Sequence, residues 1–178
     1  EGARANDRHS IFEVGTGTGC IIVTLACESD AHYFHASEVS PGALKTAREN
    51  AQHHGVLQRV HFREGPLFAG YKGTLGMIIS NPPYIRSAEI PELPAEVREY
   101  DPHVALDGGE DGLDVVRAIA NEGAPLLHHG GWILFEIGEG EAGPCRKFFE
   151  AHEAYDNVRV EKDLAGWDRY VMARRRVD

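Results

Sequence analysis

The sequence predicts an α/β fold in which a mostly parallel sheet carries helices on both faces. First, short apolar runs alternate along the chain with stretches of helical periodicity, which is the pattern of strands joined by crossover helices. Second, the length of 178 residues suits a single domain, taken here as 1–178. Third, 42% of the residues are hydrophobic and 26% are charged, which is typical of a globular protein with a buried core.

Four strands and two helices are expected before residue 81. Residues 10–14 form an apolar run that ends at a glycine, as a buried strand followed by a turn does. Ser40 is a good N-cap, and Pro41 loses no useful N–H at the first helical position, so a helix should begin there. The expected strands are 10–14, 33–39, 60–63 and 76–80, and the expected helices are 18–28 and 41–54.

Residues 81–111 show no clear periodicity and contain five of the nine prolines. Irregular segments longer than about 12–15 residues are usually functional or disordered. After this segment the pattern resumes, and its last two strands are joined by a short loop that contains glycine, so we expect them to be antiparallel. The expected helices are 113–127 and 141–153, and the expected strands are 132–137, 158–162 and 169–173, which makes seven strands with an antiparallel strand at the C-terminal end.

Charge and composition exclude several classes of protein. The 28 acidic residues outnumber the 18 basic ones, giving a net charge of −10, whereas proteins that bind nucleic acid through phosphates usually present a basic face. No apolar stretch approaches the ~20 residues of a membrane span. The ten histidines and three cysteines show no metal-ligand spacing, so we expect no metal site and reduced thiols in the cytoplasm.

A glycine-rich loop follows the first expected strand. It consists of Gly15, Thr16, Gly17, Thr18 and Gly19, and Glu13 precedes it by two positions. Such glycines let the backbone approach a ligand at a helix N-terminus. The dinucleotide fingerprint would need its third glycine at position 20, which is Cys20. The loop therefore indicates a ligand site of another kind, or a glycine turn without a ligand.

Glu38 lies at the end of the second expected strand, 19 residues beyond Gly19. A carboxylate at that place can accept hydrogen bonds from both hydroxyls of a ribose. A solvated glutamate at a strand end is the alternative. The spacing from the glycine loop favours the ligand role, because the carboxyl ends of neighbouring parallel strands meet at one edge of a sheet.

Asn81, Pro82, Pro83 and Tyr84 directly follow the fourth expected strand. The two prolines fix the backbone and remove two N–H donors, so the Asn81 carboxamide and the Pro82 carbonyl can both accept hydrogen bonds. Tyr84 offers a flat face for stacking. This set suits a planar, conjugated –NH2 group, whose nitrogen needs both hydrogens accepted as positive charge develops on it. A plain proline-rich turn is the alternative.

The sequence resembles class I S-adenosylmethionine-dependent methyltransferases with this tetrapeptide, and in particular the release-factor glutamine methyltransferases. The resemblance covers about residues 11–173, and its further motifs are Glu99-Tyr100-Asp101-Pro102, Ala105-Leu106-Asp107-Gly108-Gly109, Asp111-Gly112-Leu113-Asp114, Phe135-Glu136-Ile137-Gly138 and Lys162-Asp163-Leu164-Ala165-Gly166. It implies a Rossmann-like fold and N5-methylation of the glutamine in a Gly-Gly-Gln loop of peptide-chain release factors.

The resemblance also implies a role for each site residue. The cofactor S-adenosyl-L-methionine is expected to contact Glu13, Gly15, Thr16, Gly17, Thr18, Gly19, Glu38, Val39, Pro66, Leu67, Phe68 and Asn81. Within this set Glu38 would bind the ribose, and residues 65–68 would border the adenine. Asn81 and Pro82 would accept from the substrate amide, Tyr84 would pack on it, and Pro83 would complete the substrate contact. The expected protein is a monomer that contacts neither nucleic acid nor membrane.

Several positions depart from the family's pattern. Pro66 stands where the family has an aspartate near the adenine amine, Glu13 where aspartate is usual, and Glu141 where glutamine is frequent. The family's N-terminal helical domain is absent from this chain. Two other functions remain open: methylation of a nucleic-acid amine such as adenine N6 on a flipped base, and a nucleoside-binding module without activity.

Overall fold

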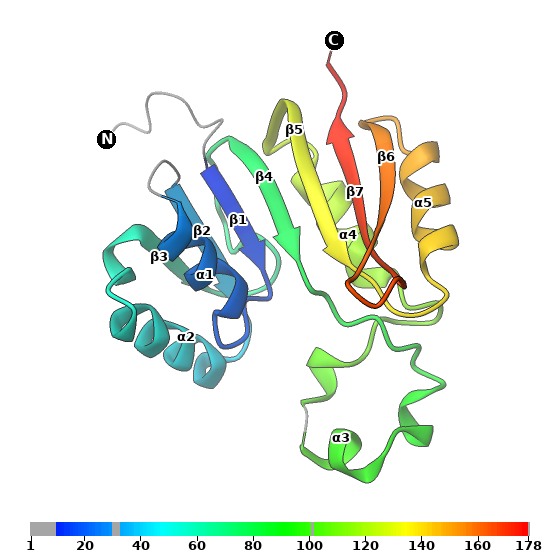
Figure 1. The fold of residues 1–178 in the computed structure, drawn as a ribbon, viewed down its shortest axis with the longest axis horizontal. Helices are drawn as coiled ribbons and strands as arrows, with labels where there is room; N and C mark the ends of the chain where they lie inside the picture. The colour runs from blue at the N-terminus through cyan, green and yellow to red at the C-terminus, as the bar shows by residue number, and fades with distance from the viewer. Residues whose placement is uncertain (1–9, 30–32, 101, 178) are drawn as a thin grey trace.

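The computed structural model describes residues 10–29, 33–100 and 102–177 (Figure 1). The described residues form a seven-stranded sheet in the order β3-β2-β1-β4-β5-β7-β6. Its strands are β1 (Ser10–Val14), β2 (Tyr33–Glu38), β3 (Val60–Glu64), β4 (Leu75–Ser80), β5 (Leu127–Glu136), β6 (Tyr155–Lys162) and β7 (Asp168–Arg175). The first five strands are parallel, and β7 is antiparallel to both β5 and β6, which confirms the predicted fold class.

Helices cover both faces of this sheet. They are α1 (Cys20–Glu28) and α2 (Pro41–His53) on one face and α4 (Asp114–Gly123) and α5 (Ala142–Ala151) on the other, while α3 (Ala95–Tyr100) lies away from the sheet (Figure 1). Side chains alternate along a strand, so Ile11 packs in one buried cluster with α1 and α2, while its neighbour Phe12 packs in a second cluster with α4 and α5. Burial of β1 and of the second half of β4 on both faces explains why apolar residues predominate in the two strands and do not alternate strictly with polar ones.

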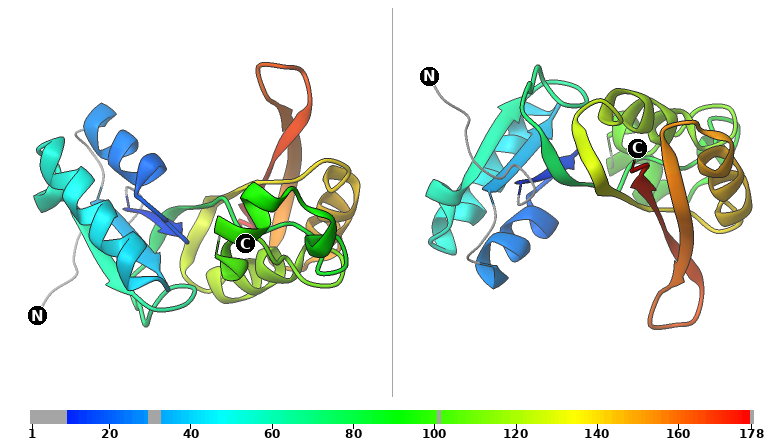
Figure 2. Two further views of the ribbon diagram at one scale, coloured as in Figure 1. Left: turned by 90° about the horizontal axis from the view of Figure 1, so that it is seen from below. Right: turned by 90° about the horizontal axis from the view of Figure 1, so that it is seen from above.

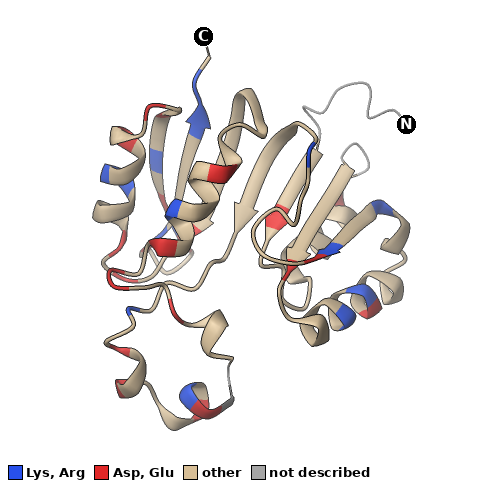
Figure 3. Cartoon of the chain, turned by 180° about the vertical axis from the view of Figure 1, so that it is seen from behind, with Lys and Arg blue, Asp and Glu red and all other residues tan. Residues whose placement is uncertain are grey.

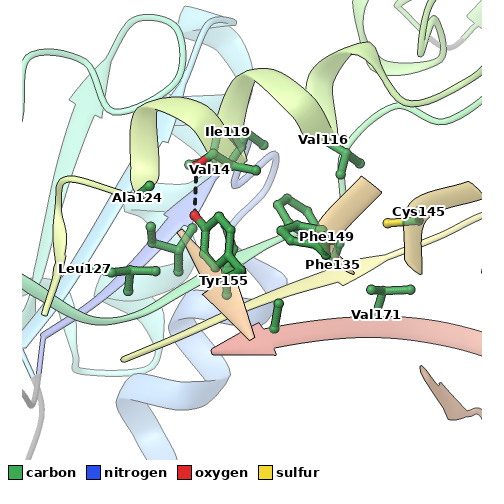
Figure 4. Close-up of a cluster of buried hydrophobic side chains, with 14 of the residues drawn as sticks. Val14, Val116, Ile119, Ala124, Leu127, Phe135, Cys145, Phe149, Tyr155 and Val171 are labelled. Atoms are coloured by element: carbon green, nitrogen blue, oxygen red, sulfur yellow. Dashed lines mark hydrogen bonds between the residues drawn. The ribbon is translucent and has the colours of Figure 1, made fainter. Parts of the chain in front are cut away.

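Tyr155 lies at the centre of the second cluster (Figure 4). Its side chain is completely buried, and its ring meets that of Phe149 edge to face at 5.2 Å between centroids. The phenol donates a hydrogen bond of 2.7 Å to the backbone carbonyl of Ala120 in α4. The start of β6 is thereby joined to the helix that covers the middle of the sheet.

The boundaries around α4 and β5 differ from the prediction. The helix ends at Gly123 rather than at residue 127, because Pro125 has no N–H for a helical hydrogen bond and its ring clashes with the preceding turn. Strand β5 begins at Leu127, five residues early, because its pairing with β4 shifts between Leu127 and Trp132. Because the pairing is irregular there, a sequence pattern that assumes strict alternation does not detect the first half of the strand.

The segment between β4 and α4 is not wholly irregular. It contains α3 and the single 3₁₀ turns Ile90–Glu92 and His103–Ala105, which are too short to produce a recognisable period. Figure 1 shows this green segment projecting beyond the carboxyl ends of the strands. The backbone N–H of Ile85 donates to Leu106 and that of Gly108 donates to Ile85, so the segment is closed at its base. We call residues 86–106 the excursion.

The strand order reverses between β1 and β4, which makes their carboxyl ends the place where an α/β sheet binds ligands. The last residues of the two strands, Val14 and Ser80, are register partners, and the Ser80 hydroxyl donates 2.7 Å to the Val14 carbonyl. The segments that follow β1, β2 and β4 therefore begin side by side at one edge. Figure 2 shows that edge from below.

We expect Tyr155→Phe to lower the free energy of unfolding by about 1 kcal/mol, because it removes one buried hydrogen bond and leaves the packing of the ring intact. Urea denaturation measures the change. Tyr33→Phe is the control, since that side chain is 62% exposed and its substitution should have little effect. Equal denaturation midpoints for Tyr155→Phe and wild type would contradict the assigned bond.

Candidate functional site

A cavity of about 630 Å³ opens at the carboxyl edge of the sheet. It is lined by the segments that follow β1, β2, β3 and β4, and residues 104–106 at the end of the excursion form part of its wall. Fourteen of the residues predicted from the sequence line it: Glu13, Gly15, Thr16, Gly17, Thr18, Glu38, Val39, Gly65, Pro66, Leu67, Asn81, Pro82, Pro83 and Tyr84. The structure thus brings the three separate sequence motifs together around one space.

Two of the predicted residues do not line this cavity. Gly19 lies against α2, and a β-carbon built on it would be 3.1 Å from the Ala47 β-carbon. Phe68 is buried in the core, where its ring meets Phe12 at 5.1 Å between centroids. Their cofactor contacts stay a prediction, and the structure adds a packing role for each: Gly19 brings α1 close to α2, and Phe68 holds the loop after β3 on the sheet.

The cavity also has lining residues to which the sequence reasoning gave no individual role. They are Val14, Cys20, Ile21, Ser37, Ser80, Ile85, Val104, Ala105, Leu106 and Val115. The residues at strand ends and helix starts could have been found from their position beside the predicted motifs. Ile85 and residues 104–106 lie in or next to the long irregular segment that the sequence marked as functional, and hydrogen bonds at the base of the excursion bring them to the cavity.

The glycine loop is held from β2. The backbone N–H groups of Gly15 and Thr16 both donate to the Ser37 carbonyl at 3.0 Å, and that of Gly17 donates to Glu38 Oε2 at 2.8 Å. Gly15 and Gly17 have φ values of 70° and 56°, which other residues rarely adopt. A β-carbon at either position would meet nothing within 4 Å. Glycine is therefore required there by backbone conformation, while the space beside the loop stays open.

Glu13 is 2% exposed and lies beneath the loop. Its Oε2 accepts hydrogen bonds from the Thr16 hydroxyl and from the backbone N–H of Ile22, the latter at 3.2 Å. Burial raises the pKa of the Glu13 carboxyl to about 7, although both hydrogen bonds oppose that rise and the nearby Glu38 adds to it. The group that fixes the loop therefore carries only part of a negative charge near neutral pH.

Glu38 presents its carboxylate at the mouth of the cavity. Its Oε2 accepts from Gly17, and its Oε1 accepts from the backbone N–H of Ser40 at 2.9 Å. A carboxylate has about four lone-pair sites, so two remain for a ligand. Glu64, its register partner at the end of β3, is exposed and does not line the cavity. The arrangement suits recognition of hydroxyl groups at Glu38 alone.

The turn at residues 81–84 faces the glycine loop across the cavity. The Asn81 side chain is exposed, and within the part of the chain that the structure describes its carboxamide has no hydrogen-bond partner. Pro82 is buried, so the backbone of the turn is fixed while its polar groups stay available. The site therefore offers acceptors for an N–H donor, placed opposite a loop that suits a nucleoside.

Neither metal ligation nor membrane insertion is indicated by the described residues. Across 10–29, 33–100 and 102–177, no three His, Cys, Asp or Glu side chains are grouped so that they could hold a metal ion. In the same ranges no helix has the length and apolar character needed to cross a bilayer.

Comparisons with known proteins agree with this geometry. The family model "Methyltransferase small domain" matches residues 3–95. The chain is 42% identical over 174 residues to the release factor glutamine methyltransferase of Cereibacter sphaeroides, covering 98% of this chain but 62% of that protein.

Solved structures with the same fold include a methyltransferase from Pyrococcus furiosus, with a TM-score of 0.70 at 18% identity over 94% of this chain and 75% of that one. A second is an RNA methyltransferase from Salinibacter ruber in complex with S-adenosyl-L-homocysteine, with a TM-score of 0.56 at 18% identity over 97% of this chain and 84% of that one. At these identities the likeness shows the fold.

We expect Glu13→Gln to stabilise the protein increasingly as the pH rises from about 4.5 to 7. The wild-type carboxyl ionises near pH 4.5 when unfolded but near 7 when folded, so the native state loses stability across that window. Glutamine keeps an acceptor for Thr16 and Ile22 without a charge. The difference in free energy of unfolding should reach up to about 3 kcal/mol above pH 7 and vanish below 4.5. A difference independent of pH, measured by denaturation at several pH values, would refute the assigned burial.

Proposed function

The chain belongs to the methyltransferase small domain family, and from that premise we propose that it methylates the side-chain nitrogen of a glutamine in a protein, with S-adenosylmethionine as methyl donor. The observation that carries the proposal is one cavity in which the Asn81 turn faces the glycine loop and Glu38. The chain spans 62% of its Cereibacter relative, so the activity of a longer protein is part of the proposal.

The residues at the cavity fit this cofactor. Its volume of about 630 Å³ lies in the range of small-molecule sites. Glu38 has free acceptor sites for the ribose hydroxyls, and the open space beside Gly15 and Gly17 admits the methionine portion. Pro66 and Leu67 border the place for the adenine, where the apolar lining favours a flat ring over a charged partner.

When bound, S-adenosylmethionine supplies an electrophilic methyl group on a positively charged sulfur. The protein's own part is to orient the acceptor nitrogen and to stabilise the charge that develops on it. The Asn81 carboxamide oxygen and the Pro82 carbonyl accept the two hydrogens of the substrate amide, which points the nitrogen toward the cofactor side of the cavity. The ring of Tyr84 packs on the flat amide.

The substrate we propose is the glutamine of the Gly-Gly-Gln loop in peptide-chain release factors. The relative with 42% identity carries that activity in its name. Val104, Ala105 and Leu106 form an apolar wall beside the turn, and Val104 is 59% exposed. A wall of this kind suits a loop in which two small, uncharged glycines precede the reacting glutamine.

The charge of the excursion favours a protein substrate over nucleic acid. Figure 3 shows acidic residues along this segment, which contains Glu89, Glu92, Glu96 and Glu99 but only two arginines, Arg86 and Arg98. A nucleic-acid strand lying along the excursion on its way to the cavity would place its phosphates beside these carboxylates. Such contacts repel, whereas nucleic-acid sites are usually basic.

Transfer of tritiated methyl groups to purified release factors and to RNA, measured side by side, tests the proposal. We expect labelled glutamine in the release factor and no label in RNA. Labelled RNA with an unlabelled release factor would support the amine methyltransferase of nucleic acid instead. Bound cofactor without transfer to either substrate would contradict both activities.

We expect Asn81→Ala to lower turnover by about 100-fold, because one of two acceptors for the developing charge is lost. Affinity for S-adenosylmethionine should change much less, and calorimetric titration distinguishes the two effects. Asn121→Ala is the matched control, since that exposed asparagine lies on α4 outside the cavity. Wild-type turnover in Asn81→Ala would remove the role of this side chain.

We expect Glu38→Ala to weaken binding of S-adenosylmethionine by about 10-fold or more, because charged hydrogen bonds to the ribose and the anchor of Gly17 are lost together. Glu64→Ala is the control, because it makes the same change at the end of the neighbouring strand, outside the cavity. Its affinity for S-adenosylmethionine should equal that of the wild type. Equal affinities for the two variants in a titration would refute the assignment to Glu38.

A further inference from the structure

Tyr84 ends the 81–84 turn and is enclosed by three buried glycines: Gly108, Gly112 and Gly138. A β-carbon built on Gly138 would lie 2.7 Å from Cδ2 of the tyrosine ring. One on Gly108 would lie 2.8 Å from its Cα, and one on Gly112 would lie 2.6 Å from its carbonyl oxygen. Real β-carbons do not approach other atoms so closely, so none of the three positions has room for a side chain. We call these residues the glycine cradle.

A buried carboxyl group joins two members of the cradle. Glu141 is 4% exposed, and its Oε2 accepts a 2.9 Å hydrogen bond from the backbone N–H of Gly138. Its Oε1 is directed at Gly112, where a β-carbon would collide with it. Burial raises the pKa of this carboxyl. Neither the cofactor nor the substrate contact proposed above uses Glu141, which lies outside the cavity lining.

The cradle is built on fixed parts of the fold. The backbone N–H of Gly108 donates to Ile85 at 2.8 Å, and the Gly108 carbonyl accepts from Asp114, the first residue of α4, at 2.9 Å. Gly138 follows the end of β5, and Glu141 directly precedes α5. The position of Tyr84 is therefore set by the ends of one strand and two helices that lie far from it in the sequence.

We propose that Gly108, Gly112, Gly138 and Glu141 are positioning residues for methyl transfer, which act by holding Tyr84 and the turn before it in place. The inference rests on the proposed function. Because Pro82 and Pro83 stiffen the turn, a displacement of Tyr84 is passed on to the acceptor groups of Pro82 and Asn81. Alignment errors of about 1 Å at a reacting centre reduce rates by about 100-fold.

Gly138→Ala tests the cradle directly. We expect turnover on a release factor to fall by about 10-fold or more, with the dissociation constant for S-adenosylmethionine changed less than about threefold. Gly143→Ala is the matched control, because that exposed glycine in α5 has nothing within 4 Å of a built β-carbon. The control should keep wild-type turnover. Equal turnover in the two variants overturns the inference.

A double-mutant cycle on thermal stability needs no substrate, so it remains decisive if release factors are not methylated. In the wild-type background Gly138→Ala should lower the melting temperature by about 5 °C, through overpacking against the tyrosine ring. In the Tyr84→Ala background it should have almost no effect, because the ring is gone. An equal loss in both backgrounds would show that the added methyl group clashes elsewhere, and overturns the inference.

Glu141 is tested by a pair of substitutions. Glu141→Gln keeps an oxygen that can accept from Gly138, so turnover should stay within about threefold of wild type. Glu141→Ala removes the acceptor and should lower turnover by about 10-fold or more at unchanged cofactor affinity. Wild-type turnover in Glu141→Ala, or a loss in Glu141→Gln as large as in Glu141→Ala, overturns the role of its carboxyl oxygen.

Discussion

Parallel pairing of β1 with β4 is the interaction on which the site depends. Their last residues, Val14 and Ser80, are register partners, so the next residues along the chain, Gly15 and Asn81, leave the sheet side by side. A slip of one residue would turn the buried side chains of either strand to the opposite face, and burial on both faces opposes it. Core packing thereby fixes the distance between the glycine loop and the turn that faces it.

Two acidic residues act on the same loop in different surroundings. Glu13 sits beneath it in the core, where burial holds a proton on the carboxyl up to about neutral pH. Glu38 sits at its rim and keeps acceptor sites toward the cavity. The two are close enough to interact, so a proton on Glu13 reduces the repulsion between them. One group can then support the backbone while the other remains available for a ligand.

The sequence predicted the parts of this protein that depend on local pattern. The strands, the glycine loop, Glu38 and the 81–84 turn each have a signal within a few residues, and β-sheet topology brings their ends together. What the local pattern does not contain depends on tertiary contacts. Gly19 belongs to the motif but packs on Ala47, and Val104 reaches the cavity because hydrogen bonds at the base of the excursion return the chain to it. The early start of β5 follows from irregular pairing with β4, which no single-strand pattern contains.

The glycines differ in what requires them, and this difference explains the layout of the site. Gly15 and Gly17 are needed for their backbone conformation beside open space, which leaves the cofactor side accessible. Gly108 and Gly138 have ordinary backbone angles but no free space, because the Tyr84 ring lies against Gly138 and the backbone of Pro83, Tyr84 and Gly112 lies against Gly108. The first pair keeps space open beside the loop, and the second lets the chain pack closely against Tyr84. Under the proposed function, binding of the cofactor and orientation of the substrate would then be set by separate parts of one cavity.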